Sequence, residues 1–106
     1  MDVFQTESAS LLIQAILALE TEDECRAFLE DLMTSQEIQA CSQRILVARY
    51  LRNKTVYSRI AKATGASSAT ISRVNRCYVY GAGGYRSVLE KLENQQAGSD
   101  EQPQRG

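Results

Sequence analysis

The sequence predicts an all-α fold of five to six short helices, and three observations lead to this prediction. Apolar residues recur at helical spacing in successive segments of the chain. A threonine followed three residues later by a glutamate, a pattern that starts helices, occurs twice. The six glycines begin only at Gly65 and the single proline is Pro103, so little interrupts helix in the first half. A chain of 106 residues fits one domain, which we expect to span 1–95.

A first helix is expected to begin at Thr6 or Ser8 and to end near Leu19, after a frayed segment 1–5. Its apolar face is broader than a lone surface helix needs. This face consists of Leu12, Ile13, Ile16, Leu17 and Leu19. Two interpretations remain open: the face packs only on its own chain, or part of it contacts a second subunit.

Two capping boxes predict the next two helices. Thr21-Glu22-Asp23-Glu24 starts a second helix that ends near Met33. Thr34-Ser35-Gln36-Glu37 starts a third helix, the longest, that ends near Arg52. The apolar stripe of the third helix contains Ile38, Cys41, Ile45 and Ala48, and it predicts that Cys41 lies in the core.

The stretch 57–76 has the pattern of two short helices joined at Gly65, which can adopt the positive φ that a sharp turn after a helix needs. The predicted inward positions are Ile60, Ala61, Thr64, Ile71 and Val74. Thr55 is expected to cap the first helix, and Ser67 to cap a second helix over 67–77. The pattern favours a helix-turn-helix whose second helix enters the DNA major groove. The alternative is an ordinary helical hairpin inside a bundle.

The net charge of −1 conceals oppositely charged parts of the chain. Residues 1–43 carry nine acids against one base, residues 44–91 ten bases against one acid, and residues 92–106 three acids against one base. The basic part contains the stretch 57–76, as phosphate binding requires. Contacts to double-stranded DNA are therefore predicted at Lys54, Arg59, Lys62, Ser67, Ser68, Thr70, Ser72, Arg73 and Arg76. The competing class is a protein-interaction module whose basic face binds an acidic partner protein.

The composition argues against several other classes of function. Histidine is absent, and Cys25, Cys41 and Cys77 lie far apart, so metal-ligand spacing and the usual general base are both missing. We expect no enzyme, no metal and no cofactor. The longest apolar stretch, near Leu11–Leu19, is too short to span a membrane. Without a signal peptide, the expected location is the cytoplasm.

The last part of the chain is expected to turn, to form one more helix and then to lose order. The glycines within 81–84 cannot continue a helix, and without a preceding strand they indicate a turn whose tyrosines pack on the core. Val88, Leu89 and Leu92 mark a final helix over about 84–95. The polar tail 96–106 is expected to be disordered.

The order of these elements, with a helix-turn-helix in fourth and fifth place and one closing helix, resembles the tryptophan repressor superfamily. The stretch 64–76, followed by Tyr80-Gly81 and Gly84-Tyr85, resembles its TrpR-like YerC/YecD group. The resemblance covers about residues 8–94. It implies an intertwined homodimer and a transcriptional regulator, of the repressor type, that binds the two halves of a palindromic operator.

The resemblance also implies a small-molecule pocket. Arg44 and Arg73 match the two arginines that flank tryptophan in the tryptophan repressor, and Thr34 matches a threonine of the family. Val74 stands where that repressor has a glycine, and Asp31 replaces a leucine that would line the pocket. We therefore do not expect tryptophan to be the corepressor. Another small effector, or none, remains open.

Overall fold

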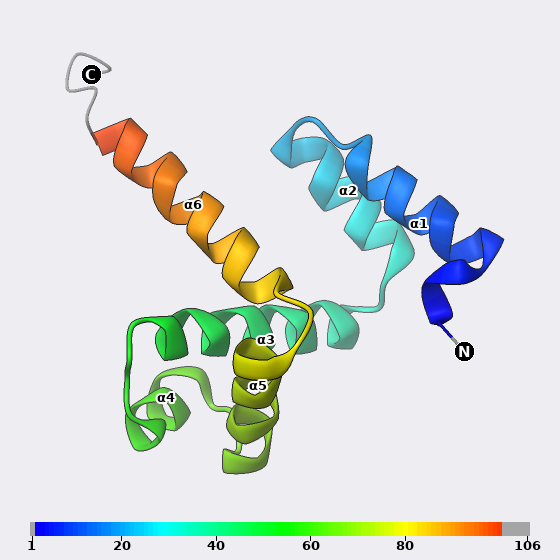
Figure 1. The fold of residues 1–106 in the computed structure, drawn as a ribbon. Coiled ribbons are helices and arrows are strands. Elements are labelled where there is room, and N and C mark those ends of the chain that lie inside the picture. The colour runs from blue at the N-terminus through cyan, green and yellow to red at the C-terminus, as the bar shows by residue number, and fades with distance from the viewer. Residues whose placement is uncertain (1, 101–106) are drawn as a thin grey trace. The chain divides into compact units, whose positions relative to one another are not determined.

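The computed structural model describes residues 2–100, with the backbone alone at 98–100. This range contains one short 3-10 helix, six α-helices and no strand, which confirms the predicted all-α class (Figure 1). The elements are η1 Val3–Gln5, α1 Glu7–Leu17, α2 Glu22–Leu32, α3 Ser35–Arg52, α4 Tyr57–Thr64, α5 Ser68–Tyr80 and α6 Gly84–Asp100. The chain divides into two compact units, 1–38 and 39–106, and the boundary falls inside α3.

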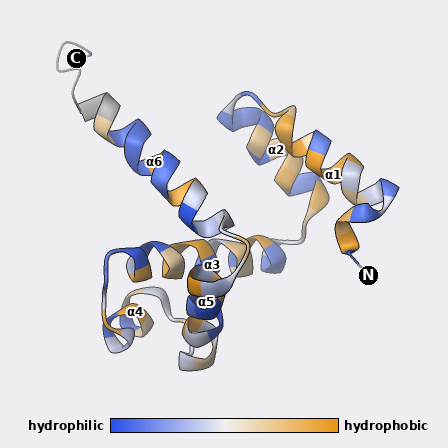
Figure 2. Cartoon of the chain, viewed as in Figure 1, coloured by the Kyte–Doolittle hydropathy of each residue, from blue (hydrophilic) through white to orange (hydrophobic). Residues whose placement is uncertain are grey.

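The first unit contains η1, α1 and α2, and none of its residues within 2–38 is buried. Five large apolar side chains of α1 remain exposed, namely Leu11, Leu12, Ile13, Ile16 and Leu17. Figure 2 shows hydrophobic residues along both α1 and α2. The broad apolar face that the sequence predicts is therefore present, except that Leu19 lies beyond the end of α1 and is half-buried. This unit has no buried core of its own within 2–38.

Local hydrogen bonds decide where the first elements begin. The Asp2 carboxylate accepts a hydrogen bond from the Phe4 N–H at 2.9 Å and so starts η1. The prediction that residues 1–5 fray is therefore wrong for 3–5. Thr6 caps α1, as predicted, and α1 ends at Leu17, two residues before the predicted end.

The two predicted capping boxes start α2 and α3. At α3 the box is reciprocal, because the Glu37 N–H donates to Thr34 Oγ1 at 3.1 Å and the Thr34 N–H donates to Glu37 Oε1 at 2.9 Å. At α2 the Glu24 N–H donates to Thr21 Oγ1 at 3.1 Å. The Glu24 carboxylate, however, accepts from the N–H of Glu20, one residue before the cap, at 2.9 Å.

The second unit holds the core, which joins the second half of α3 to α4, α5 and α6. The buried residues are Val47, Ala48, Ile60, Ala66, Ile71, Val74 and Leu89. α3 contributes to this cluster from Ile45 onward. The prediction that Cys41 lies in the core is wrong: its side chain is exposed, because it lies one turn before the part of α3 that the core covers.

The turn after α5 brings two tyrosines to the core and leaves a third outside. Tyr78 and Tyr85 pack against the buried cluster, as predicted. Tyr80 is 84% exposed, which contradicts the prediction for this residue. Two residues rotate an α-helix by about 200°, so Tyr80 lies on the opposite side of α5 from Tyr78.

α6 begins at Gly84, as predicted, and continues to Asp100. The prediction of disorder is wrong for 96–100, where the backbone stays helical. Glutamine and alanine favour helix even without an apolar face. Residues 101–106, also predicted to be disordered, lie outside the described residues. In the described range, no helix combines the length and apolar character needed to cross a membrane.

Candidate nucleic-acid interface

α4 and α5 form a helix-turn-helix whose turn is built around Gly65. Gly65 has a φ of 75°, and its N–H donates to the Ala61 carbonyl at 2.8 Å. The Thr64 hydroxyl donates to the Ile60 carbonyl at 2.8 Å and accepts from the Ala66 N–H at 3.1 Å. The side chain of Thr64 therefore ties the last turn of α4 to the segment that enters α5.

Gln43 connects this turn to α3. Its Nε2 donates to the Thr64 carbonyl at 3.1 Å. No local signal in the sequence predicts this contact, because the spacing of polar residues on a helix does not say which distant carbonyl one of them meets. The bond ties the turn of the motif to the helix that supports it.

The inner sides of α4 and α5 are closed by apolar packing. Ile60, Ile71 and Val74 are buried, as predicted, and Ala61 and Thr64 are half-buried. Because side chains on opposite sides of a helix point in opposite directions, the buried inner positions leave the polar and cationic residues outside.

The start of α4 differs from the prediction. Its N-cap is Val56, which makes no side-chain hydrogen bond, so the prediction that Thr55 caps this helix is wrong. Thr55 lies one residue too early, and its N–H donates to the Tyr50 carbonyl at 3.1 Å. The first N–H groups of α4 therefore receive no capping side chain.

A surface hollow of about 490 Å³ lies beside the start of α4. Two of the predicted DNA-contacting cations line it, Lys54 and Arg59. The other lining residues are Tyr50, Asn53, Thr55, Val56 and Ala63. Cations beside an uncapped helix N-terminus favour a phosphate at this place.

Ser67 caps α5, as predicted, because its Oγ accepts from the Thr70 N–H at 3.1 Å. The Ser67 hydroxyl also donates to Thr70 Oγ1 at 3.1 Å. The hydroxyls of both predicted contact residues are thus engaged in the cap, whereas Ser68 and Ser72 are exposed. α5 continues to Tyr80, three residues beyond the predicted end.

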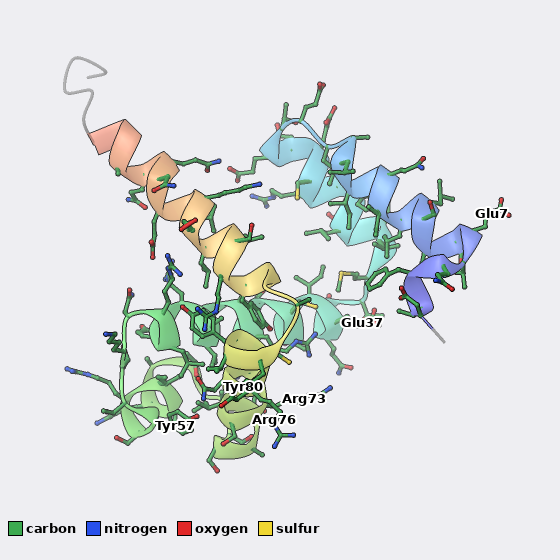
Figure 3. The ribbon with its side chains drawn as sticks, viewed as in Figure 1. Glu7, Glu37, Tyr57, Arg73, Arg76 and Tyr80 are labelled. Carbon is green, nitrogen blue, oxygen red and sulfur yellow. The ribbon has the colours of Figure 1, made fainter. Side chains whose placement is uncertain are left out.

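The cations of the motif lie on its outer surface. Arg73 and Arg76 are exposed, and Figure 3 shows both projecting from α5. Lys54, Arg59 and Lys62 are also exposed. The ion pairs of the described residues lie elsewhere and involve none of these five cations. We call these five residues the cationic face.

The residues of the predicted small-molecule pocket have separate roles in this chain. Thr34 caps α3, Arg73 is exposed on α5, and Arg44 donates from Nη2 to Cys41 Sγ at 3.2 Å. A pocket formed by these residues stays a prediction. In the part of the chain that the structure describes, no group of His, Cys, Asp and Glu side chains is arranged to hold a metal ion.

A helical domain with a helix-turn-helix and an outer cationic face is typical of DNA-binding regulators. Residues 7–93 match the family described as Trp repressor protein. The chain belongs to this family, which is a regulatory family and not an enzyme family.

Two relatives confirm the predicted group and fold. YerC of Bacillus subtilis (strain 168), itself an uncharacterized protein, is 42% identical over 93 residues, which cover 88% of this chain and 89% of YerC. The crystal structure of a TrpR like protein from Eubacterium eligens ATCC 27750 matches with a TM-score of 0.82 and 49% identity. That match covers 85% of this chain and 93% of the other.

Proposed function

We propose that this protein is a cytoplasmic transcriptional regulator of the repressor type, which binds a palindromic DNA operator as a homodimer. The observation that carries the proposal is the cationic face, whose five exposed side chains form no ion pair among the described residues. Double-stranded DNA offers the phosphates that such a face attracts. The helix-turn-helix supplies the element that enters the major groove.

The exposed residues of α5 would make two kinds of contact with DNA. Arg73 and Arg76 would contact guanine edges or phosphates, because a guanidinium pairs with either through two hydrogen bonds. Ser68 and Ser72 are exposed on the same helix and would add single hydrogen bonds.

The remaining predicted contacts would bind the DNA backbone. The Ser67 hydroxyl is used in the cap, so the backbone N–H groups at the start of α5 would approach a phosphate in its place. The Thr70 hydroxyl only accepts a hydrogen bond in the cap, so its O–H would still donate to a phosphate. Lys54 and Arg59, in the hollow beside α4, and Lys62 would hold the flanking phosphates.

The homodimer is supported by the surface of the chain. Five large apolar side chains of α1 remain exposed, and no residue within 2–38 is buried. Soluble monomers rarely leave a contiguous apolar face of this kind open to water. A second copy seated on the apolar face of α1 would supply the core that the first unit lacks.

We propose that tryptophan is not required for binding. Val74 fills part of the buried core with a branched side chain where the tryptophan repressor has a glycine. Asp31 would add a carboxylate beside that of the ligand. DNA affinity should therefore be the same with and without added tryptophan.

The experiment that tests the proposal selects bound duplexes from a random DNA library. Wild-type protein is expected to enrich a palindrome, and Arg73→Ala to enrich it weakly or with relaxed sequence. Arg26→Ala is the matched control, because Arg26 is an exposed arginine on α2, outside the cationic face. It should enrich the same palindrome as the wild type.

Salt dependence separates DNA binding from binding of an acidic protein. If the cationic face neutralises phosphates, log K should fall with log salt by a slope of about 0.9 for each phosphate. A flat response together with no enriched sequence would contradict the proposal. It would favour the protein-interaction module as the function of the same surface.

A further inference from the structure

The C-terminal end of α5 is held by two arginines that come from other helices. Arg86, in α6, donates from Nε to the Tyr78 carbonyl at 2.8 Å, and its Cζ lies 4.8 Å from the centre of the Tyr78 ring. Arg52, the last residue of α3, donates from Nη1 to the Tyr78 hydroxyl at 3.4 Å. The Arg52 Nε in turn donates to Glu93 Oε2 at 2.8 Å. We call these four residues the Tyr78 clamp.

The clamp holds Tyr78 at its carbonyl, its ring face and its hydroxyl. The carbonyl is one of the last four of α5, which have no partner within the helix, so the Arg86 N–H satisfies a group that would otherwise need water. A cation at this end is also favoured by the helix dipole. The Tyr78 ring itself packs against the buried core. The end of α5 is thereby tied to both α3 and α6.

We propose that the Tyr78 clamp sets the orientation of the recognition helix, and that Arg52 and Arg86 are positioning residues for sequence recognition. The proposal rests on the proposed function, because it assumes that α5 contacts the bases. Arg76 lies two residues and Arg73 five residues before Tyr78 on the same helix. Since a helix moves as a unit, release of Tyr78 changes where both arginine side chains reach.

The rival explanation is that Arg86, which is exposed, binds a DNA phosphate directly. The two roles demand different chemistry. A phosphate contact needs a positive charge, which lysine supplies. The clamp needs the Nε–H and the flat guanidinium that lies over the Tyr78 ring, and lysine has neither. Arg86→Lys therefore separates the two roles while it keeps the charge of the protein.

The experiment measures the affinity of Arg86→Lys for the enriched palindrome and for a scrambled duplex over a range of salt concentrations. We expect the ratio of specific to non-specific affinity to fall about tenfold, with the salt slope and the non-specific affinity unchanged. Arg49→Lys makes the same change at an exposed arginine of α3 outside the clamp; it is the matched control and should keep the wild-type ratio. A wild-type ratio in Arg86→Lys would overturn the proposal. The proposal would also be overturned if Arg86→Gln kept the wild-type ratio of specific to non-specific affinity while its salt slope fell by about 0.9.

A measurement without DNA distinguishes failure of the clamp from failure of the proposed function. Amide hydrogen exchange over 76–81 should become faster in Arg86→Lys, while exchange within α4 stays as in the wild type. Tyr78→Phe, which keeps the ring and the carbonyl and loses only the hydroxyl, should show a smaller change of the same kind. Unchanged exchange in Arg86→Lys would refute the clamp. A wild type that prefers no sequence would instead refute the proposed function, and the recognition role of the clamp with it.

Discussion

Replacement of Ile16 by serine tests whether the apolar face of α1 is a subunit interface. The Ile16 side chain is 52% exposed, and four other exposed apolar residues lie on the same helix. Full burial of an isoleucine contributes about 1.5–3 kcal/mol, so burial of the exposed half contributes about 1 kcal/mol per chain. A two-fold symmetric interface counts this contribution twice, or about 2 kcal/mol per dimer. The dissociation constant of Ile16→Ser should therefore rise about thirtyfold.

Sedimentation equilibrium over a range of protein concentrations measures this change. Gln14→Ser is the matched control, since it places the same residue at an exposed polar position of α1 and carries a similar cost in helix propensity. The control should dimerise like the wild type. A wild type that is monomeric at all concentrations would refute the inference from the exposed surface. A dimeric wild type with an unaffected Ile16→Ser would show that subunits associate through another surface.

Two further predictions concern the stability of the fold. Gly65→Ala should lower the free energy of unfolding by about 1–2 kcal/mol, because φ is positive there while no atom lies within 4 Å of the added Cβ, so the cost is purely conformational. Gly84→Ala, with the same open space but no positive φ, should raise the free energy of unfolding by about 0.4–1 kcal/mol. Denaturant titrations measure both changes, and equal effects of the two substitutions would contradict this account. The hydrogen bond from Arg52 holds the pKa of Glu93 below its ordinary value, so the pair stabilises the fold above the unfolded-state pKa and loses this effect as pH falls through the folded-state pKa. The difference in melting temperature between wild type and Glu93→Gln should be constant from about pH 7 to about pH 5 and vanish as the pH falls further, and a difference that persists in acid would show that the carboxylate charge is not responsible.

Features that depend on a few neighbouring residues could be predicted from the sequence. The caps at Thr6, Thr34 and Ser67 and the left-handed Gly65 are all confirmed. Each rests on hydrogen bonds or backbone angles within about four residues, so the local sequence contains the information needed. The same holds for the inward face of the helix-turn-helix, which follows from helical spacing.

The predictions for Cys41 and Tyr80 failed because the burial of each side chain depended on distant parts of the chain. Cys41 and Ala48 lie two turns apart on one stripe of α3, yet only Ala48 is buried, because the core covers only the second half of that helix. Tyr78 and Tyr80 are the same type of residue two positions apart, but only Tyr78 lies on the side of α5 that packs against the core. Spacing predicts which residues share a face and cannot tell how far a neighbouring element extends along it.

The sequence by itself determined the helical class, the position of the turn at Gly65 and the concentration of cations around the motif, because helix formation, capping and net charge are local or additive properties. The tertiary structure decided the contacts that join the motif to its supporting helices. Gln43 meets Thr64 across the turn, and Arg52 and Arg86 meet at Tyr78, although these residues are widely separated in sequence. Such contacts form only when packed helices bring their partners within hydrogen-bonding distance, and helical spacing does not specify that packing.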